Sequence, residues 1–309
     1  MPLAVIKKLP NDKKRILYYA LTLPGNGQNN PPLPVAEYLT NNHTTANMSG
    51  WLLEFIRDVS SIKKLHVQRI ETDFSYALLH AISRAFNESS LVRYLNDCYS
   101  VARGDIPPAA IRTVIHICSA HSVKAFVNGL GRHCKEKCAK EFYCRVCAFL
   151  IDEIALPSIS VTFFHLCIVG LSQNITAEVH ESLVYLQAKV AEVVDPLVKQ
   201  EEVHKTNNIS VDLLKFDTRI KNNHFGLHFQ EVRRRAEAMA VLNRQGDKNN
   251  LYNPAAITYL LGTWMPVVPL WTGIVLAVRN TGETHYSNAH AENWFRIVKH
   301  KILQRKYRR

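Results

Sequence analysis

This sequence has few acidic residues, no signal peptide and no repeated or low-complexity segment. Its 26 Asp and Glu are outnumbered by 38 Lys and Arg, which gives a formal net charge of +12. That surplus favours a polyanionic partner, most often nucleic acid, although an acidic membrane surface also fits it. With 47% hydrophobic residues the chain is globular and not disordered, and its 309 residues form one large domain or two smaller ones.

The missing signal peptide and the cysteine count point to the same compartment. No signal peptide follows Met1, and the seven cysteines are an odd number, so we expect reduced thiols rather than a disulfide framework. A nuclear or cytoplasmic location follows, and secretion is not expected. We recognise no small-molecule site and no separate sequence-specific DNA-binding module, such as a zinc finger.

The charge-free run 255–278 is long enough to cross a bilayer. Pro266 and Pro269 would break a helix in mid-membrane, and interspersed glycine and threonine dilute its apolarity. A membrane or scaffold protein built around this run is one alternative. We favour two short buried helices around a corner formed by Trp264 and Trp271.

Apolar and β-branched patterns predict alternating strands and helices in the first part of the chain. Residues 15–24 and 33–40 are typical of strands joined by a long polar loop, which predicts a hairpin. The next elements expected, in the order helix, strand, helix, strand, are 47–64, 67–73, 75–86 and 112–121. From 122 to about 251 the pattern is mainly helical. This order predicts an α/β fold with a mixed sheet.

Asp73 is the first candidate functional residue, because it ends the strand expected at 67–73. A carboxylate at the carboxyl end of a strand points into whatever lies above the sheet and is a suitable metal ligand. The same aspartate could instead cap the helix expected at 75–86 by accepting hydrogen bonds from its free amides. The sequence leaves both interpretations open.

The segment 284–309 has the pattern of an amphipathic basic helix, with Glu292 in its first turns. The glutamate is either a ligand beside a phosphate-binding surface or a solvated acid that complements the helix dipole. The basic residues after it favour nucleic-acid contact or a nuclear localisation signal, although an ordinary solvated helix end has a similar composition. They are Arg296, Lys299, Lys301, Arg305, Lys306, Arg308 and Arg309.

Taken in order, these features resemble the RNase H-like core of Mutator-like transposases. The resemblance rests on the strand order and on three motifs, ETDFSYALLHAI, CSAH and SNAHAENWFRIVKHKI. Enzymes of this family carry an Asp, Asp, Glu (DDE) catalytic set, a Cys-x-x-His shortly after the second Asp and a long helical insertion before the Glu. The resemblance implies that Asp73 is the second Asp and Glu292 the final Glu. Cys118 and His121 would be the Cys-x-x-His.

The resemblance also implies an architecture and a cofactor. Residues 1–121 and 284–309 would form an RNase H-like mixed-sheet core, interrupted by a mainly α-helical insertion at 122–283. Asp73 and Glu292 would then approach within one metal-site width and hold Mg²⁺ or Mn²⁺, the ions that support cutting and joining of DNA. The partner would be DNA, whose backbone the basic residues bind without reading its sequence.

One residue of the family pattern is missing. In the family the first Asp lies on the first, central strand, and here 3–10 resembles the tail of that segment, so the position falls at or before Met1. Asp12 lies beyond the strand and cannot replace it. We therefore expect a short first strand and a transposase-derived DNA-binding protein without complete DNA-cleaving activity. The alternative is an active metal-dependent transposase or nuclease, if an upstream segment supplies the Asp.

Structural roles compete for the residues near the last expected strand. Cys118 and His121 could simply line its buried end instead of facing DNA. His116 alternates with Cys118 along the strand, which is typical of a core histidine.

A second metal site is conceivable at 133–147 but is not favoured. Cys144 and Cys147 have the spacing of half a zinc site, which the further His and Cys at 133, 134 and 138 could complete. The same spacing puts the thiols on one side of a helix, where free cysteine is commonly buried. We therefore do not expect zinc. The residues concerned are His133, Cys134, Cys138, Cys144 and Cys147.

Overall fold

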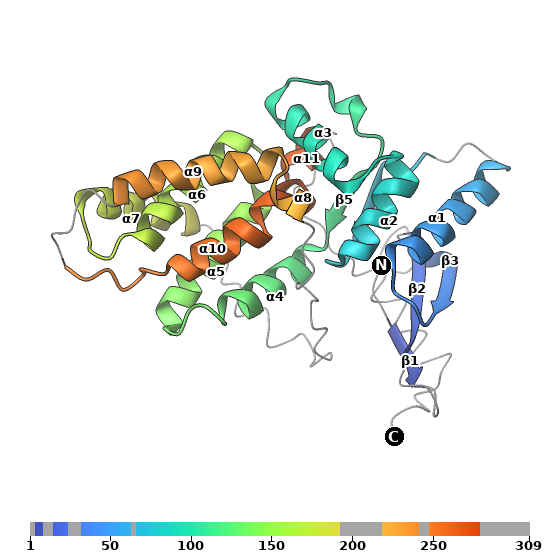
Figure 1. The fold of residues 1–309 in the computed structure, drawn as a ribbon, viewed down its shortest axis with the longest axis horizontal. Helices are drawn as coiled ribbons and strands as arrows, with labels where there is room; N and C mark the ends of the chain where they lie inside the picture. The colour runs from blue at the N-terminus through green and yellow to red at the C-terminus, as the bar shows by residue number, and fades with distance from the viewer. Residues whose placement is uncertain are drawn as a thin grey trace. The chain divides into compact units, whose positions relative to one another are not determined.

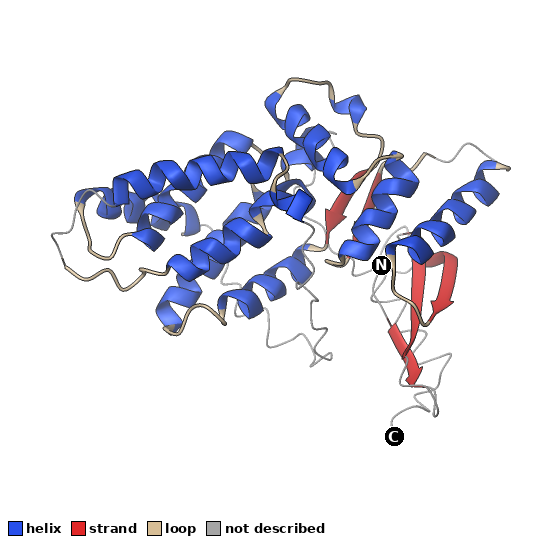
Figure 2. Cartoon of the chain, in the orientation of Figure 1, coloured by secondary structure: helices blue, strands red, loops and turns tan. Residues whose placement is uncertain are grey.

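The computed structural model describes residues 4–8, 15–23, 32–62, 66–191, 218–240 and 247–278. Within these ranges the chain is a mainly helical α/β protein with small sheets (Figures 1 and 2). Its contacts divide it into two units. The first holds the described residues up to Leu91 together with Arg112–Cys118, and the second holds Val92–Ile111 and the described residues from Ser119 onward.

The first three strands form an antiparallel sheet in the first unit. They are β1 (Ala4–Lys8), β2 (Arg15–Leu23) and β3 (Leu33–Thr40), with β2 in the middle. β2 and β3 pair as the predicted hairpin, with Leu17 opposite Thr40 at one end and Leu23 opposite Leu33 at the other. β1 has five residues against nine in β2, which agrees with the expected short first strand.

Helix α1 (Thr45–Ser60) begins at a capping residue and packs aromatic side chains on this sheet. The Thr44 hydroxyl accepts a hydrogen bond from the Asn47 backbone N–H at 3.4 Å. Trp51 stacks on Tyr38 of β3, with ring centroids 5.4 Å apart. This contact is the main aromatic link between α1 and the hairpin.

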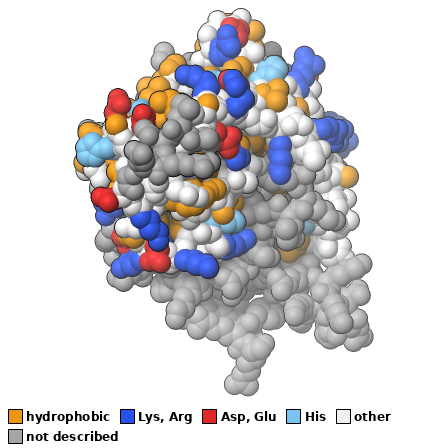
Figure 3. Space-filling model, turned by 60° about the vertical axis from the view of Figure 1, so that its left-hand side comes forward, with side chains coloured by type: hydrophobic (Ala, Val, Ile, Leu, Met, Phe, Trp, Pro, Cys, Tyr) orange, Lys and Arg blue, Asp and Glu red, His pale blue; other side chains and the backbone are white. Residues whose placement is uncertain are grey.

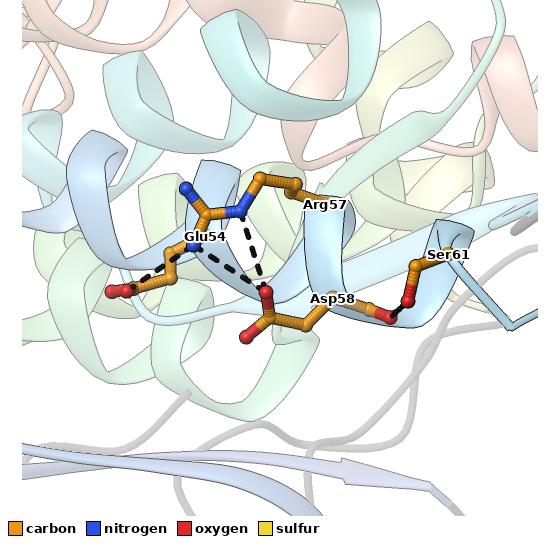
Figure 4. A network of polar contacts seen from close by, with 4 residues as sticks. All are labelled: Glu54, Arg57, Asp58 and Ser61. Carbon is orange, nitrogen blue, oxygen red and sulfur yellow. Dashed lines mark hydrogen bonds and ion pairs between the residues drawn. The ribbon is translucent and has the colours of Figure 1, made fainter.

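The outer face of α1 carries an exposed ion-pair network (Figure 4). Arg57 contacts Glu54 and Asp58, each at 3.4 Å, and the Ser61 hydroxyl donates to the Asp58 carbonyl at 2.6 Å. The Arg57 side chain is 73% exposed, so these pairs contribute little to stability. This face is solvated.

Two short parallel strands form the second sheet of the first unit. They are β4 (Arg69–Thr72) and β5 (Val114–Ile117), paired from Arg69 opposite Val114 to Thr72 opposite Ile117. Helix α2 (Tyr76–Asn87) follows β4 and packs against β5 and α1. All four β5 side chains are buried, as is usual for a parallel strand covered on both faces.

A group of hydrogen bonds sets the register of this parallel pair. The Asn87 side chain, at the end of α2, donates to the Thr113 carbonyl at 2.9 Å and accepts from the Thr113 N–H at 3.0 Å. The Thr113 hydroxyl in turn donates to the carbonyl of Val67 at 2.6 Å. One buried threonine therefore joins the end of α2 to the starts of both strands.

The last expected strand, 112–121, is too long. β5 ends at Ile117, and α4 (Ser119–Leu130) starts two residues later, so His121 lies on a helix. The chain leaves the sheet at this point because a parallel strand is followed by a crossover element rather than a tight turn.

The described strands form two separate sheets and not one. The expected RNase H-like core needs β1 as the central strand of a single mixed sheet, and no pairing of β1 with β4 occurs among the described strands. The structure therefore shows a mixed α/β protein in which the expected elements follow in order, with a further helix, Leu91–Arg103, between α2 and β5. The single sheet and the three expected regions, 1–121, 122–283 and 284–309, stay predictions.

The second unit is helical in its described part. It begins with α3 (Leu91–Arg103), η1 (Pro108–Ala110) and α4. The later elements are α5 (Lys137–Asp152), α6 (Leu156–Leu171), α7 (Ala177–Val190), α8 (Thr218–Lys221), α9 (His224–Ala240), α10 (Pro254–Thr263), η3 (Met265–Leu270) and α11 (Ile274–Val278). Helix α6 packs against α7, α9 and α10. It is apolar on nearly all sides, with 166–170 buried without a break, which is typical of a central helix.

Helix α3 is the element that the sequence analysis missed. Its buried residues recur at helical spacing, with Leu91, Tyr94, Leu95, Cys98 and Val101 all on one face. That stripe was available in the sequence and would have identified the helix.

The charge-free run forms the predicted corner of short buried elements. α10 ends at Thr263, and Trp264 and Trp271 flank η3, both fully buried with ring centroids 5.8 Å apart. The Trp271 indole N–H donates to the Trp264 carbonyl at 3.0 Å, which satisfies a polar group inside the corner. No helix of the described residues is long and apolar enough to span a bilayer.

Two glycines on helices of the second unit provide a matched test of this packing. A Cβ on Gly170 of α6 would lie 2.5 Å from Ile257 Cγ1 and 2.7 Å from the Tyr143 hydroxyl, whereas a Cβ on Gly262 of α10 would meet nothing within 4 Å. We expect Gly170→Ala to lower the free energy of unfolding by about 1–3 kcal/mol through overpacking. Gly262→Ala should raise it by up to about 1 kcal/mol, because alanine favours the helix. Urea unfolding of both variants checks this, and equal effects would contradict the packing.

Candidate functional site

Asp73 lies at the carboxyl end of β4, as the sequence predicts. Its side chain is half-buried, and its carbonyl accepts a hydrogen bond from the Ser75 N–H at 2.8 Å in a tight turn. The N-cap of α2 is Ser75, two residues further on, with extended backbone angles (φ −136°, ψ 117°). Ser75, and not Asp73, is therefore the N-cap residue of α2, and the role of Asp73 as a metal ligand stays a prediction.

Cys118 lies at the same edge of the sheet as Asp73. The ladder pairs Thr72 with Ile117, and one step further the Cys118 N–H donates to the Thr72 carbonyl at 3.1 Å. Because both strands end here and run parallel, Asp73 and Cys118 follow them at neighbouring positions. The Cys118 side chain is fully buried. The expected Asp and the first residue of the expected Cys-x-x-His thus share one strand edge.

The two histidines near this edge, His116 and His121, differ in burial and in secondary structure. His116 is fully buried on β5, opposite Glu71 of β4, which confirms that it is a core histidine. His121 lies in the first turn of α4 and is half-buried. Whether Cys118 and His121 act together stays a prediction of the resemblance.

A chain of polar contacts that the sequence analysis missed holds the start of α2. The Ser75 hydroxyl and His43 Nε2 lie 2.9 Å apart, and His43 Nδ1 is hydrogen-bonded to the hydroxyl of Tyr19 on β2. The rings of Tyr19 and His43 stack at 5.8 Å. The turn that carries Asp73 is thereby connected to the antiparallel sheet, so its position does not depend on β4 alone.

Burial shifts the pKa of both Tyr19 and His43. It lowers the pKa of His43 below the ordinary histidine value and raises that of Tyr19 well above the ordinary tyrosine value, the latter with a smaller contribution from Tyr38. Both groups are therefore held in their neutral forms at neutral pH. Tyr19, His43 and Ser75 are 24 and 32 residues apart in sequence, so no short spacing motif predicts that they contact one another.

Cys144 and Cys147 lie on the buried face of α5, whereas Cys134 lies in the loop before this helix and not on the same helix face. Cys134, Cys144 and Cys147 are buried, Cys138 is exposed, and the Asn253 side-chain amide donates to Cys134 Sγ at 3.3 Å. Burial raises the pKa of Cys134 to about 11 and that of Cys144 to about 12. These thiols are therefore protonated at neutral pH. In the ranges that the structure describes, no three His, Cys, Asp or Glu residues gather closely enough to hold a metal ion.

The remaining candidates lie outside the described residues. They are Glu292, Arg296, Lys299, Lys301, Arg305, Lys306, Arg308 and Arg309. The expected approach of Asp73 to Glu292 therefore stays a prediction.

Comparison with known proteins gives one match. No protein-family model and no solved structure matches the chain. Among curated proteins it is similar to the "120.7 kDa protein in NOF-FB transposable element" of Drosophila melanogaster, with 29% identity over 174 residues. The match covers 55% of this chain and 15% of that protein, so it spans only a small part of the relative's length. It indicates a transposon-related origin.

The His43 contacts predict a pH dependence of stability. Because the pKa of His43 is lowered in the folded state, its contribution to the free energy of unfolding is complete above the unfolded-state pKa of about 6.5. That contribution is lost as the pH falls from this value through the folded-state pKa. Urea unfolding at about pH 7.5 and about pH 5.5 should show a smaller loss in His43→Gln than in the unmodified protein.

An exposed histidine provides the control for this measurement. His180→Gln, on α7, should retain the full loss of stability on acidification, because its side chain is exposed. The assignment to His43 is wrong if both variants lose as much stability as the unmodified protein.

Proposed function

We propose that this chain is a transposase-derived protein that binds the DNA backbone, and that these 309 residues alone do not cut DNA. The observation that carries the proposal is the similarity to a transposable-element protein over 55% of the chain. The finer assignment, to a Mutator-like DDE transposase with an RNase H-like core, rests on the resemblance of the motifs. Residues placed at one strand edge support it further.

The arrangement of β4 and β5 supports the RNase H-like assignment. Asp73 and Cys118 follow neighbouring parallel strands, and three antiparallel strands and a helix precede them in the chain. Rigid strand ends are suitable places for carboxylates that must keep a fixed geometry around metal ions. Mg²⁺ or Mn²⁺ would be held by Asp73 and Glu292 and would supply charge neutralisation at the phosphate.

The net charge of +12 and the basic segment near the end of the sequence support DNA as the partner. On the face drawn in Figure 3, the Lys and Arg side chains of the described residues are scattered among acidic and apolar ones and form no continuous patch. The densest basic segment in the sequence is 296–309, beside the expected ligand Glu292. We therefore assign the main backbone contacts to this segment, which follows the proposed ligand Glu292 in the sequence. A nuclear location is the corresponding proposal.

The proposed lack of cleavage follows from the number of carboxylates. Two-metal hydrolysis of a phosphodiester uses a carboxylate shared between the ions in addition to ligands on each ion. This sequence matches the family pattern at Asp73 and Glu292 only. Two ions held by these residues alone would bind weakly and in loose geometry.

Binding to duplex DNA is expected to be strongly salt-dependent. The logarithm of the association constant should fall linearly with the logarithm of salt concentration, with a slope of about −0.9 for each phosphate contact. Replacing the six Lys and Arg of 299–309 by Gln should make this slope shallower by up to about 0.9 for each contact removed. Fluorescence anisotropy with a labelled duplex measures both quantities.

Two exposed arginines give a matched control for the binding measurement. Arg57 and Arg112 are each ion-paired at the surface, Arg57 with Glu54 and Asp58, and Arg112 with Glu88 at 2.5 Å. The double variant Arg57→Gln, Arg112→Gln should retain the slope. Absence of duplex binding at low salt would remove the proposed function.

Plasmid nicking tests the second half of the proposal. Supercoiled plasmid incubated with the protein and Mg²⁺ or Mn²⁺ should stay supercoiled, because the shared carboxylate is lacking. Asp73→Ala should bind duplex DNA as well as the unmodified protein does. Robust nicking that disappears in both Asp73→Ala and Glu292→Ala would establish the alternative, an active metal-dependent transposase or nuclease.

A further inference from the structure

A hollow of about 440 Å³ lies on the second unit where residues of α3, the segment after it and α9 meet. It is a shallow depression that is largely open to solvent, and its volume lies within the range of ligand sites in proteins. Neither Asp73 nor Cys118 is among the residues that line it. Its lining consists of aromatic, basic and small polar side chains together with one acid, namely Tyr99, Ser100, Arg103, Asp105, His224, Leu227 and His228.

A directed chain of hydrogen bonds holds the floor of the hollow. The Ser160 hydroxyl donates to the Leu156 carbonyl at 2.7 Å, so its single proton is used and its oxygen accepts from His228 Nε2–H at 2.7 Å. His228 Nδ1 then accepts from the Tyr99 hydroxyl, a longer contact of 3.4 Å. Burial lowers the pKa of His228, and the nearby charge of Arg103 lowers it further. The His228 ring is therefore neutral, as this series of hydrogen bonds requires.

Aromatic contacts leave one face of this cluster open. Tyr99 packs edge-on against the buried ring of Phe225, with centroids 5.0 Å apart, and lies 5.6 Å from His224 and 5.8 Å from His228. His224 is exposed, and Leu227 beside it is 51% exposed. A flat ring bound here would meet aromatic and apolar surface that water now covers.

Arg103 supplies the positive charge of the hollow. Its guanidinium lies 5.8 Å from the centre of the Tyr99 ring, and a hydrogen bond to Tyr99, with a smaller contribution from Asp105, raises its pKa. Arg103 also pairs with Asp105 at 3.2 Å, but both side chains are more than half exposed, so a phosphate can replace that pairing. Two of the first amides of α9 are already bonded, since the His224 N–H donates to Asn96 Oδ1 at 2.9 Å and the Gly226 N–H to Asn223 Oδ1 at 2.8 Å. The anion contact therefore falls to Arg103.

We propose that this hollow binds one unpaired nucleotide, with the base against Tyr99 and His224 and the phosphate at Arg103. Stacking on aromatic rings tolerates any base, and an arginine beside the rings holds the backbone, which are the two components of single-strand binding sites. The inference rests on the proposed function in one respect only, namely that the ligand in the cell is an unpaired stretch of the bound DNA. The hollow itself can be tested without duplex DNA.

The first experiment uses a mononucleotide and the full chain. Titration with thymidine 5′-monophosphate should shift the imidazole NMR signals of His224 and His228, and His224→Ala or Arg103→Gln should weaken binding about tenfold. Arg234→Gln is the matched control, because Arg234 is likewise exposed and paired with one acid, Glu231, but does not line the hollow. Equal shifts with inorganic phosphate alone would reduce the site to anion binding and overturn the proposal.

The second experiment compares a blunt duplex with the same duplex carrying a short thymidine tail. The tailed duplex should bind about tenfold more tightly, and Arg103→Gln should remove that advantage without changing the affinity for the blunt duplex. If the tailed duplex binds no more tightly than the blunt one and the mononucleotide causes no NMR shifts, the proposed nucleotide site is wrong. Binding to the blunt duplex would be unaffected by that result. Mononucleotide binding without any duplex binding supports the hollow and overturns the proposed function.

Discussion

The parallel pairing of β4 with β5 is the interaction on which the candidate site depends. Two four-residue strands have little area of their own, so their register relies on the buried Thr113, which bonds to both Asn87 and Val67 at the entrance to the sheet. At the exit, the Cys118 N–H bonds to the Thr72 carbonyl. Because the register is held at both ends, Asp73 and Cys118 leave the sheet side by side. A slip of one residue would turn one of them to the opposite face.

The turn after β4 is held by polar groups that are costly to bury unless they are paired. Tyr19, His43 and Ser75 satisfy one another, and burial keeps both rings neutral. Such a chain restricts the start of α2 without placing a competing charge near Asp73.

The second unit uses asparagine side chains where its helices end. Asn249 is buried and donates to the Val169 and Ser172 carbonyls at 2.7 and 2.8 Å, at the end of α6. Asn253 caps α10, and its side chain also reaches the His133 carbonyl. These contacts satisfy helix ends inside an apolar core. They allow the charge-free run after Asn253 to be buried in the protein as short elements around Trp264 and Trp271.

Local patterns in the sequence determined the hairpin of β2 and β3, helices α1 and α2, and the corner at Trp264, because periodicity, turn residues and proline act over a few residues. They also placed Asp73 at a strand end. Tertiary structure decided which candidates meet: Cys118 reaches Asp73 only through the ladder, and Tyr19 and Ser75 meet through His43, 24 and 32 residues away. The hollow at Tyr99 and His228 likewise joins residues 129 apart. Contacts of that range depend on how whole elements pack, and short-range spacing carries no record of them.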